Sequence, residues 1–310
     1  MYHGIINVYK EPGYTSHDVV ARLRGILKQK KIGHTGTLDP AAEGVLPVCL
    51  GVGTRLCDLL TDRTKTYEAV LLLGMVTDTQ DTTGQVLHEA AEAAAALSDE
   101  SVLTAVLSFR GEYDQVPPMY SALKVDGKKL YELARAGKEI ERQSRRVHIL
   151  EIQVKKVELP RVWMSVTCSK GTYIRTLCHD IGEKLGCGGC MEHLTRTRVD
   201  RFDLKDSLKL DEIEKLRDEG RLDTCILSVE EALGSYGALA VRPEADAFLH
   251  NGNPCFKNQL ACDQDGMEKP EDGQKFRMYD SSGQFAGVYQ YQEDRHWWKP
   301  WKMFLVPEQS

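Results

Sequence analysis

Hydrophobic and polar residues follow two periods along the chain, and these predict two kinds of element. Apolar runs between turn residues predict strands at 4–9, 45–50, 67–73, 147–157 and 162–169. Apolar residues that recur every three or four positions predict helices at 17–30, 54–60, 98–109, 127–136, 171–185, 211–217 and 228–233. The Ala-rich stretch 90–96 is consistent with a helix or a surface linker. Ser16 and Ser98 stand where they would cap two of these helices. In the helix at 98–109 the period turns Leu103, Val106 and Leu107 inward.

The pattern changes near Gly237. From there to the end, short strand-like runs are separated by Gly, Asp and Asn, as in the segment 283–289. Closely spaced short strands with turn residues between them are typical of a small β domain. We therefore expect a domain boundary at about residue 236.

Composition limits the class of protein. The 310 residues suffice for two domains with buried cores. No apolar run approaches the roughly 20 residues of a membrane span, and the first residues lack the features of a signal peptide. We expect a cytoplasmic protein without a membrane segment, in which the nine cysteines are buried thiols rather than disulfides.

Charge is distributed unevenly. The net charge of −6 argues weakly against a nucleic-acid partner, but phosphate binding depends on local patches. Basic residues concentrate between 120 and 147, namely Lys124, Lys128, Lys129, Arg135, Lys138, Arg142, Arg145 and Arg146, against Asp126, Glu132, Glu139 and Glu141. This excess of positive charge is what RNA contact requires, although a solvated charged helix would look similar.

The segment 33–49 is the best candidate for a functional loop. Glycines at 33, 36 and 44 permit unusual backbone angles or close approach of a ligand, and Pro40 restricts Asp39 to an extended conformation. Locally, Asp-Pro is a common turn initiator, so the pattern around Asp39 by itself favours a structural turn.

Several ordered motifs change that balance. They are GHTGTLDP at 33–40 with GVLP at 44–47, KEPGYTS at 10–16, KTY at 65–67, TDTQDTTG at 77–84, SALKVDG at 121–127, YELAR at 131–135, GTYIRTL at 171–177 and HLTRTR at 193–198. Together they resemble the signature of the bacterial tRNA pseudouridine-55 synthases, the TruB-type family. The resemblance covers roughly residues 3 to 202.

The resemblance implies a fold and an activity. The fold is α+β, with a catalytic domain at 1–236 built on a mixed, largely antiparallel central sheet flanked by helices. An RNA-binding insertion at about 112–147 and a small β-rich, PUA-like domain at 237–310 complete it. The implied activity is cofactor-free isomerisation of uridine to pseudouridine in the T arm of tRNA, at position 55, with the base flipped out. We expect a monomer that needs tRNA but no obligatory protein partner.

The resemblance also implies roles for single residues. Asp39 is the nucleophile, Arg175 is the cation that keeps it ionised, and Asp81 is the second carboxylate around that arginine. Tyr67 stacks on the flipped uracil, with a proton-transfer role as the weaker alternative because a phenol has a pKa near 10.

Further residues are implied in substrate binding. Tyr173 and Leu194 match pocket-lining positions, and His34 matches the residue that enters the RNA when the base leaves, although it could merely hydrogen-bond the turn. Lys10, Lys124, Lys128 and Lys129 complete the expected substrate-binding set.

Other interpretations compete with this one. Cys187 and Cys190 have the spacing of a redox or zinc pair, but one pair is weak evidence for a metal, and we expect none. Asp78 and Asp81 could bind Mg²⁺. The rival functions are a synthase for another uridine, including a guide-RNA-dependent relative, a non-catalytic RNA-binding or RNA-folding protein, and a zinc-bound adaptor.

Overall fold

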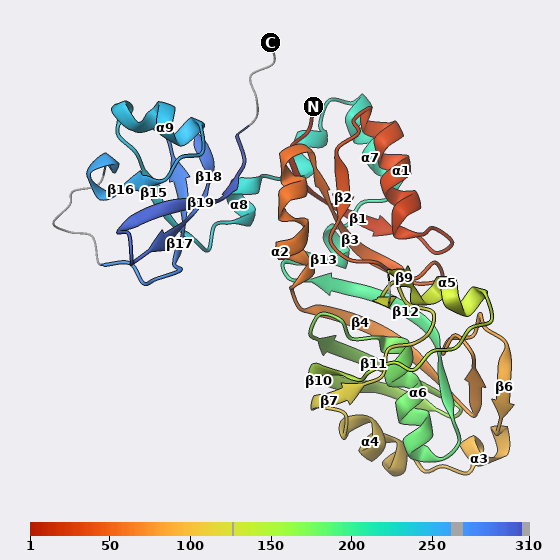
Figure 1. Cartoon of the computed structure of the whole chain (residues 1–310). Helices are drawn as coiled ribbons and strands as arrows, with labels where there is room; N and C mark the ends of the chain where they lie inside the picture. The colour runs from red at the N-terminus through yellow and green to blue at the C-terminus, as the bar shows by residue number, and fades with distance from the viewer. Residues whose placement is uncertain (126, 262–268, 306–310) are drawn as a thin grey trace.

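The computed structural model describes residues 1–125, 127–261 and 269–305. Two β-sheets dominate it (Figure 1). The larger sheet and its helices are formed by the chain up to α8 (Val229–Ala232), and the smaller sheet is formed by the chain from β15 (Gly237–Ala240) onward. The change of pattern near Gly237 therefore coincides with the passage from one sheet to the other.

The larger sheet is mixed and largely antiparallel, as expected. Its strands lie in the order β14 (Ile226–Leu227), β1 (Gly4–Lys10), β3 (Glu43–Leu50), β12 (Gly189–Val199), β4 (Lys65–Leu73), β11 (Arg161–Cys168), β10 (Arg145–Glu158) and β7 (Gly111–Gln115), with β2 (Ile32–His34) on β3 and β13 (Phe202–Asp203) on β12. The junction of β3 with β12 is the one parallel pairing among them. Strands from distant parts of the sequence thereby become neighbours at the centre of the sheet.

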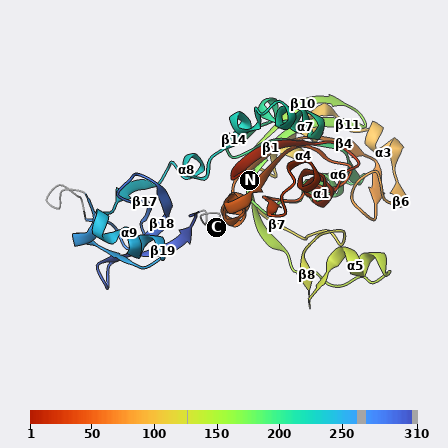
Figure 2. The ribbon, with the colours of Figure 1, turned by 90° about the horizontal axis from the view of Figure 1, so that it is seen from above.

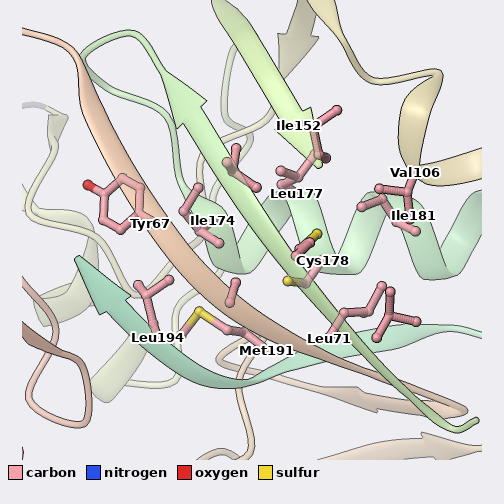
Figure 3. Packing of buried hydrophobic residues seen from close by; sticks show 14 of the residues in the cluster. Tyr67, Leu71, Val106, Ile152, Ile174, Leu177, Cys178, Ile181, Met191 and Leu194 are labelled. Atoms are coloured by element: carbon pink, nitrogen blue, oxygen red, sulfur yellow. The ribbon is translucent and has the colours of Figure 1, made fainter. Parts of the chain in front are cut away.

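Helices cover this sheet at both ends (Figure 1). α1 (Ser16–Leu27) and α7 (Leu210–Asp218) pack on β1–β3, while α4 (Asp99–Leu107) and α6 (Ile174–Leu185) pack on the β4 end. α2 (Cys57–Thr61) lies beside β1 and β3 toward the smaller sheet, and α3 (Ala91–Ala95) follows the hairpin of β5 (Met75–Thr77) and β6 (Val86–Glu89). Figure 3 shows the core under α6, with Tyr67, Ile174 and Leu194 toward one end and Val106 and Ile181 toward the other.

The start of α1 differs from the sequence prediction. Thr15 is the N-cap, because its side chain accepts a hydrogen bond from the backbone N–H of Asp18. Ser16 is buried, and its hydroxyl accepts a hydrogen bond from the Leu38 N–H at 2.9 Å. The helix ends at Leu27, earlier than expected, since Lys28 adopts a left-handed conformation. The residue predicted to cap the helix instead joins it to the loop of Asp39.

Two other helix predictions were partly wrong. Ser98 caps α4 as expected, but Val102, Ala105 and Val106 face the core, so that Leu103 and Leu107 are exposed. In the segment 127–136 only α5 (Leu130–Arg135) is helical. The preceding lysines form a hairpin of β8 (Lys124–Val125) and β9 (Lys128–Lys129), because Gly127 takes a positive φ of 80°.

The basic insertion is shorter than expected. Residues 111–115 and 145–149 pair with one another in the large sheet, so only 116–144 leaves it. Figure 2 shows α5 and β8 projecting from the body of the sheet. Asp126, one of the acids counted in this segment, lies outside the described residues.

The smaller sheet has the strand order β15, β17 (Lys275–Tyr279), β18 (Phe285–Gln292), β19 (Trp297–Met303) and β16 (Cys255–Phe256), and α9 (Asp246–His250) packs beside it. Trp298 is 2% exposed in its core. β19 also touches the first part of the chain, where Lys302 Nζ donates to the Asp58 carboxylate at 2.6 Å. This sheet confirms the expected C-terminal β domain.

The cap of α1 leads to a first prediction. Thr15→Ala should lower the free energy of unfolding by about 1 kcal/mol, because the N–H of Asp18 loses its acceptor. Urea denaturation measures the change. Thr15→Ser keeps the hydroxyl and serves as the control; an equal loss in both variants would contradict the capping role.

Candidate functional site

The loop that carries Asp39 spans residues 35–42, between β2 and β3. At its start, the N–H and the hydroxyl of Thr35 both donate to Pro47 O of β3 at 3.2 Å. At its end, the Ala42 N–H donates to Asp39 O at 3.1 Å and closes a turn. Gly44 closes the loop with a φ of 106°, and a Cβ there would lie 2.3 Å from the Arg196 carbonyl oxygen. A glycine is therefore required where this loop meets β12.

Asp39 forms a bidentate ion pair with Arg175. Arg175 Nε lies 2.9 Å from Asp39 Oδ2, and Nη2 lies 3.2 Å from Oδ1. The Arg175 side chain is 5% exposed and the Asp39 side chain is 37% exposed. The arginine is thus fixed inside the protein, while the carboxylate reaches the surface of the site.

Arg175 also gathers two other loops. Its Nη1 donates to Thr79 O at 2.8 Å, and its Nη2 donates to Tyr120 O at 2.8 Å. One guanidinium thereby joins the Asp39 loop, the loop after β5 and the start of the basic insertion. A lysine has no planar fork and could not reproduce these directions.

Asp81 stands at the far side of Arg175, with Oδ2 at 3.7 Å from Nη1. Its Oδ1 is used within its own loop, where it accepts from the Thr79 hydroxyl at 2.7 Å and from the Thr83 N–H at 3.0 Å. The structure thus places Asp81 near Arg175, as the resemblance implied, and most of its hydrogen bonding shapes the loop.

The charges around Asp39 have opposing effects on its pKa. Desolvation raises the pKa of Asp39 above its ordinary value, the positive charge of Arg175 opposes that rise, and the negative charge of Asp81 adds to it. The net direction is upward. Arg175 is the largest of the effects that favour the ionised form of Asp39, and desolvation opposes it.

Tyr67 lies on β4, between Val166 of β11 and Arg196 of β12. It is 8% exposed and packs in the same apolar cluster as Leu38, Ile174 and Leu194. Burial raises the pKa of Tyr67 above its usual value, an effect that Arg196 only partly offsets. The phenol is therefore neutral at physiological pH, which suits stacking better than proton abstraction.

Tyr173 and Leu194 were expected to line the pocket. Leu194 is buried in the cluster that contains Tyr67, and Tyr173 is half-buried at the N-cap of α6. The side-chain amide of Gln115 holds the Tyr173 backbone from both sides, accepting from its N–H at 2.8 Å and donating to its carbonyl at 3.0 Å. Gln115 was missed because no local motif marks it.

His34 ends β2 and is half-buried. Its Nδ1 accepts a hydrogen bond from the Gly36 N–H at 3.3 Å, and its ring meets that of His17 edge to face at 5.3 Å. Burial is the largest of the effects that lower the pKa of His34. In this structure the imidazole supports the turn, which was the alternative reading of this residue.

Lys10 differs from the expectation that it binds substrate. Its side chain is 0% exposed, and its ammonium donates to the carbonyl oxygens of Glu11, Pro40 and Ala42. Burial lowers the pKa of Lys10 to about 8. Lys10 therefore binds the backbone of the Asp39 loop at Pro40 and Ala42, and its ammonium group is buried in the protein.

Arg196 is a third buried cation in this site, and sequence reasoning missed its role. It is 1% exposed; Nε donates to Val45 O at 2.7 Å, Nη1 to Thr37 O at 3.4 Å and Nη2 to Gly36 O at 3.3 Å. It thus ties β12 to both ends of the Asp39 loop. Its sequence signal was its place two residues after Leu194, on the buried face of the strand.

The basic residues of the insertion divide into two groups. Arg142 pairs with Glu139 at 3.2 Å, and Arg146, just beyond the insertion in β10, pairs with Asp114 at 2.7 Å. Lys124 and Lys128 on the hairpin are exposed, and Lys129 Nζ donates to the Tyr131 hydroxyl at 3.1 Å. The hairpin therefore presents exposed positive charge to a polyanion, and Arg135 and Lys138 of the insertion are exposed as well.

The cysteine pair at 187 and 190 shows no metal-site geometry. Both side chains are buried, and burial raises the pKa of each thiol. Among the residues that the structure describes, no three His, Cys, Asp or Glu side chains are grouped as metal ligands. In the same described ranges, no helix has the length and apolar character needed to cross a bilayer.

Comparison with known proteins gives consistent matches. Residues 24–174 match the family model described as TruB family pseudouridylate synthase (N terminal domain), and 175–234 match the tRNA pseudouridylate synthase B C-terminal domain. The tRNA pseudouridine synthase B of Lachnoclostridium phytofermentans is 53% identical, over 98% of this chain and 100% of that protein. The corresponding protein of Clostridium acetobutylicum is 42% identical, over 94% and 96%.

Solved structures share the fold. A chain in the structure of an H/ACA ribonucleoprotein bound to a substrate RNA matches with a TM-score of 0.71 and 23% identity, over 99% of this chain and 86% of that chain. A chain of an archaeal box H/ACA complex matches with a TM-score of 0.69 and 23% identity, over 99% and 87%. At this identity the likeness concerns the fold.

The ion pair leads to a prediction about Asp39. Arg175→Met should raise the pKa of Asp39 further, because the guanidinium is the main opponent of desolvation. Carbon-13 NMR of labelled aspartate follows the titration in the folded protein. Arg161→Met removes an exposed arginine paired with Glu192 and should leave the Asp39 titration unchanged. An unaltered or lowered Asp39 pKa in Arg175→Met would refute this account.

Proposed function

Because this chain belongs to the TruB family of pseudouridylate synthases, we propose that it isomerises a uridine in the T arm of tRNA, at position 55, to pseudouridine. The observation that carries the proposal is the bidentate ion pair between Asp39, on the loop 35–42, and the buried Arg175 of α6. The residues around that pair bind the RNA and hold the flipped base.

The reaction conserves all atoms of the base. The bond from C1′ to N1 breaks, the uracil turns, a bond from C1′ to C5 forms, and the hydrogen lost from C5 is balanced by one gained at N1. Asp39 supplies the nucleophile, as a carboxylate can without metal or cofactor. Arg175 opposes its protonation and fixes the direction of its oxygens, which lowers the cost of reaching the reactive geometry.

Tyr67 provides the surface on which the flipped uracil stacks. A neutral, buried phenol ring beside Ile174 and Leu194 offers an aromatic face within an apolar wall. Tyr173 lies at the N-terminus of the helix that carries Arg175, held there by Gln115. These residues hold the base while Asp39 acts at the sugar or the ring.

RNA must open before the base reaches this pocket. Flipping a nucleotide costs a few kcal/mol, and we assign to His34 the filling of the space that the base leaves. Its position at the end of β2, immediately before the Asp39 loop, supports this role. Entry into RNA would exchange its contacts with Gly36 and His17 for stacking on bases.

The exposed lysines of the β8–β9 hairpin would hold the phosphate backbone. Lys124 and Lys128 are exposed, and Lys129 is the cross-strand partner of Lys124. Figure 2 shows β8 and α5 projecting from the body of the sheet. We further propose a catalytic domain at 1–236 with this insertion, a PUA-like domain at 237–310, and action as a cytoplasmic monomer without an obligatory protein partner.

The activity has a direct test. Purified protein incubated with unmodified tRNA, with no guide RNA and no cofactor, should produce pseudouridine at position 55, as mapped by chemical labelling and sequencing. Product at another uridine would favour a different target, and tRNA binding without product would favour a non-catalytic RNA-binding protein.

The nucleophile has its own test. Asp39→Asn should reduce turnover by roughly 10⁴-fold or more, because the amide is not a nucleophile, while tRNA affinity persists. Single-turnover kinetics and filter binding measure the two quantities. Asp62→Asn, in an exposed carboxylate paired with Lys170, is the matched control. Retained turnover in Asp39→Asn would reject the assignment.

The hairpin lysines predict a change in salt dependence. The double substitution Lys128→Glu and Lys129→Glu should weaken tRNA binding and reduce the slope of log affinity against log salt by about 2, since two phosphate contacts are lost. The control is the double substitution Lys155→Glu and Lys156→Glu. These lysines lie about ten residues along β10 from Arg145, where the insertion rejoins the sheet, which is roughly 30 Å along the strand. Equal slopes in both double variants would indicate a merely solvated hairpin.

A further inference from the structure

Two cysteines that the proposed mechanism does not use meet where α2 packs on the large sheet. Cys49 lies near the end of β3 and is 0% exposed, whereas Cys57 begins α2 and is partly exposed. Cys49 is the cross-strand partner of Gly33, and a Cβ built on Gly33 would lie 3.1 Å from Cys57 Sγ. The Cys57 sulfur therefore rests against the backbone of Gly33, directly across the strand pair from Cys49, and both cysteines belong to one apolar cluster.

Cys57 also opens to a cleft. It lines a space of about 560 Å³ between residues 54–58 on one side and 301–303 of β19 on the other. Small solutes can enter a cleft of this size. The pair thus consists of one thiol that a reagent can reach and one buried directly behind it.

The surroundings make the two thiols unequal. The pKa of Cys57 is lowered chiefly by its interaction with Cys49, and the charge of Lys302 acts in the same direction, against burial and the carboxylate of Asp58. The same interaction, together with burial in the core, raises the pKa of Cys49. The thiolate, which is the reactive form of cysteine, therefore forms at the exposed member of the pair.

We propose that Cys57 is a peroxide-reactive thiol and that Cys49 resolves its oxidised form as a reversible disulfide. In the first step the Cys57 thiolate attacks hydrogen peroxide, the O–O bond breaks, and a sulfenic acid forms with release of hydroxide. In the second step the Cys49 sulfur attacks that sulfenic sulfur and water leaves. Two thiols and one peroxide yield one disulfide and two waters.

The other cysteine pair lacks these properties. Cys187 and Cys190 are both buried, and burial raises the pKa of each thiol. Their spacing in the sequence suggests a redox pair, but neither combines access with a favoured thiolate. The proposed redox pair is therefore Cys49 and Cys57, which the fold brings together, and not the two cysteines that stand close in the sequence.

The location links the pair to the proposed active site without depending on it. Cys49 and Gly33 belong to the β2–β3 hairpin, and the loop of that hairpin carries Asp39. A disulfide would tie this hairpin to α2, whose Asp58 holds Lys302 of the C-terminal sheet. The thiol chemistry is measured directly, so its failure and the failure of the synthase activity are separate results.

The experiment uses the full chain and mass spectrometry. Purified protein is treated with hydrogen peroxide, alkylated and digested with trypsin, which cuts after Arg55 and so separates Cys49 from Cys57. We expect the peptides 32–55 and 56–63 joined, lighter by two hydrogens than their sum, and released by dithiothreitol. Cys49→Ser should stop the reaction at a sulfenic acid on Cys57 that dimedone traps, and Cys57→Ser should abolish both products.

Two controls keep the outcome decisive. Cys225 is partly exposed, and Cys225→Ser should leave the 49–57 link intact. In the unsubstituted protein, iodoacetamide should label Cys57 about tenfold faster than Cys225, because the lowered pKa of Cys57 favours its thiolate. Equal labelling rates, or oxidation of Cys225 or of the 187–190 pair with no 49–57 link, would overturn the proposal.

Discussion

The arrangement of the catalytic part depends on one buried guanidinium. Arg175 binds both oxygens of Asp39 and also the carbonyl oxygens of Thr79 and Tyr120. Burying a charge is costly unless it is paired and hydrogen-bonded, so these loops must come together for the arginine to be accommodated. The same requirement fixes the carboxylate and connects it to the start of the basic insertion.

Two further buried cations extend this principle below the loop of Asp39. Lys10, at the end of β1, donates to the carbonyl oxygens of Glu11, Pro40 and Ala42, and Arg196 donates to three more around residues 36–45. The loop has little regular structure of its own, so side chains from β1 and β12 satisfy its carbonyls. Rigidity near Asp39 therefore comes from distant strands, and the desolvation that raises its pKa is a consequence of that enclosure.

Local sequence pattern predicted the elements well where the packing face was regular. The strand pair β10–β11 and most helices lie where the apolar period placed them. Errors arose where a competing contact decided the outcome: Ser16 bonds Leu38 rather than capping α1, and Gly127 turns a hairpin in place of a helix. The prediction rotated the buried face of α4 by one residue. Val-Leu pairs at 102–103 and 106–107 offer two apolar faces with the same period, so the period alone does not decide which one is buried.

The sequence by itself determined the family and most of the order of strands and helices, and its ordered motifs marked Asp39 as the proposed nucleophile, since motifs and apolar periods are local properties of the chain. Only the tertiary structure decided that Lys10 is buried, that Arg196 and Gln115 hold the site, and that Cys49 meets Cys57. These facts depend on desolvation and on hydrogen bonds between segments far apart in the sequence. The alternation along β12 marks Arg196 as facing inward but not what it binds, because these contacts exist only once the strands are ordered in the sheet.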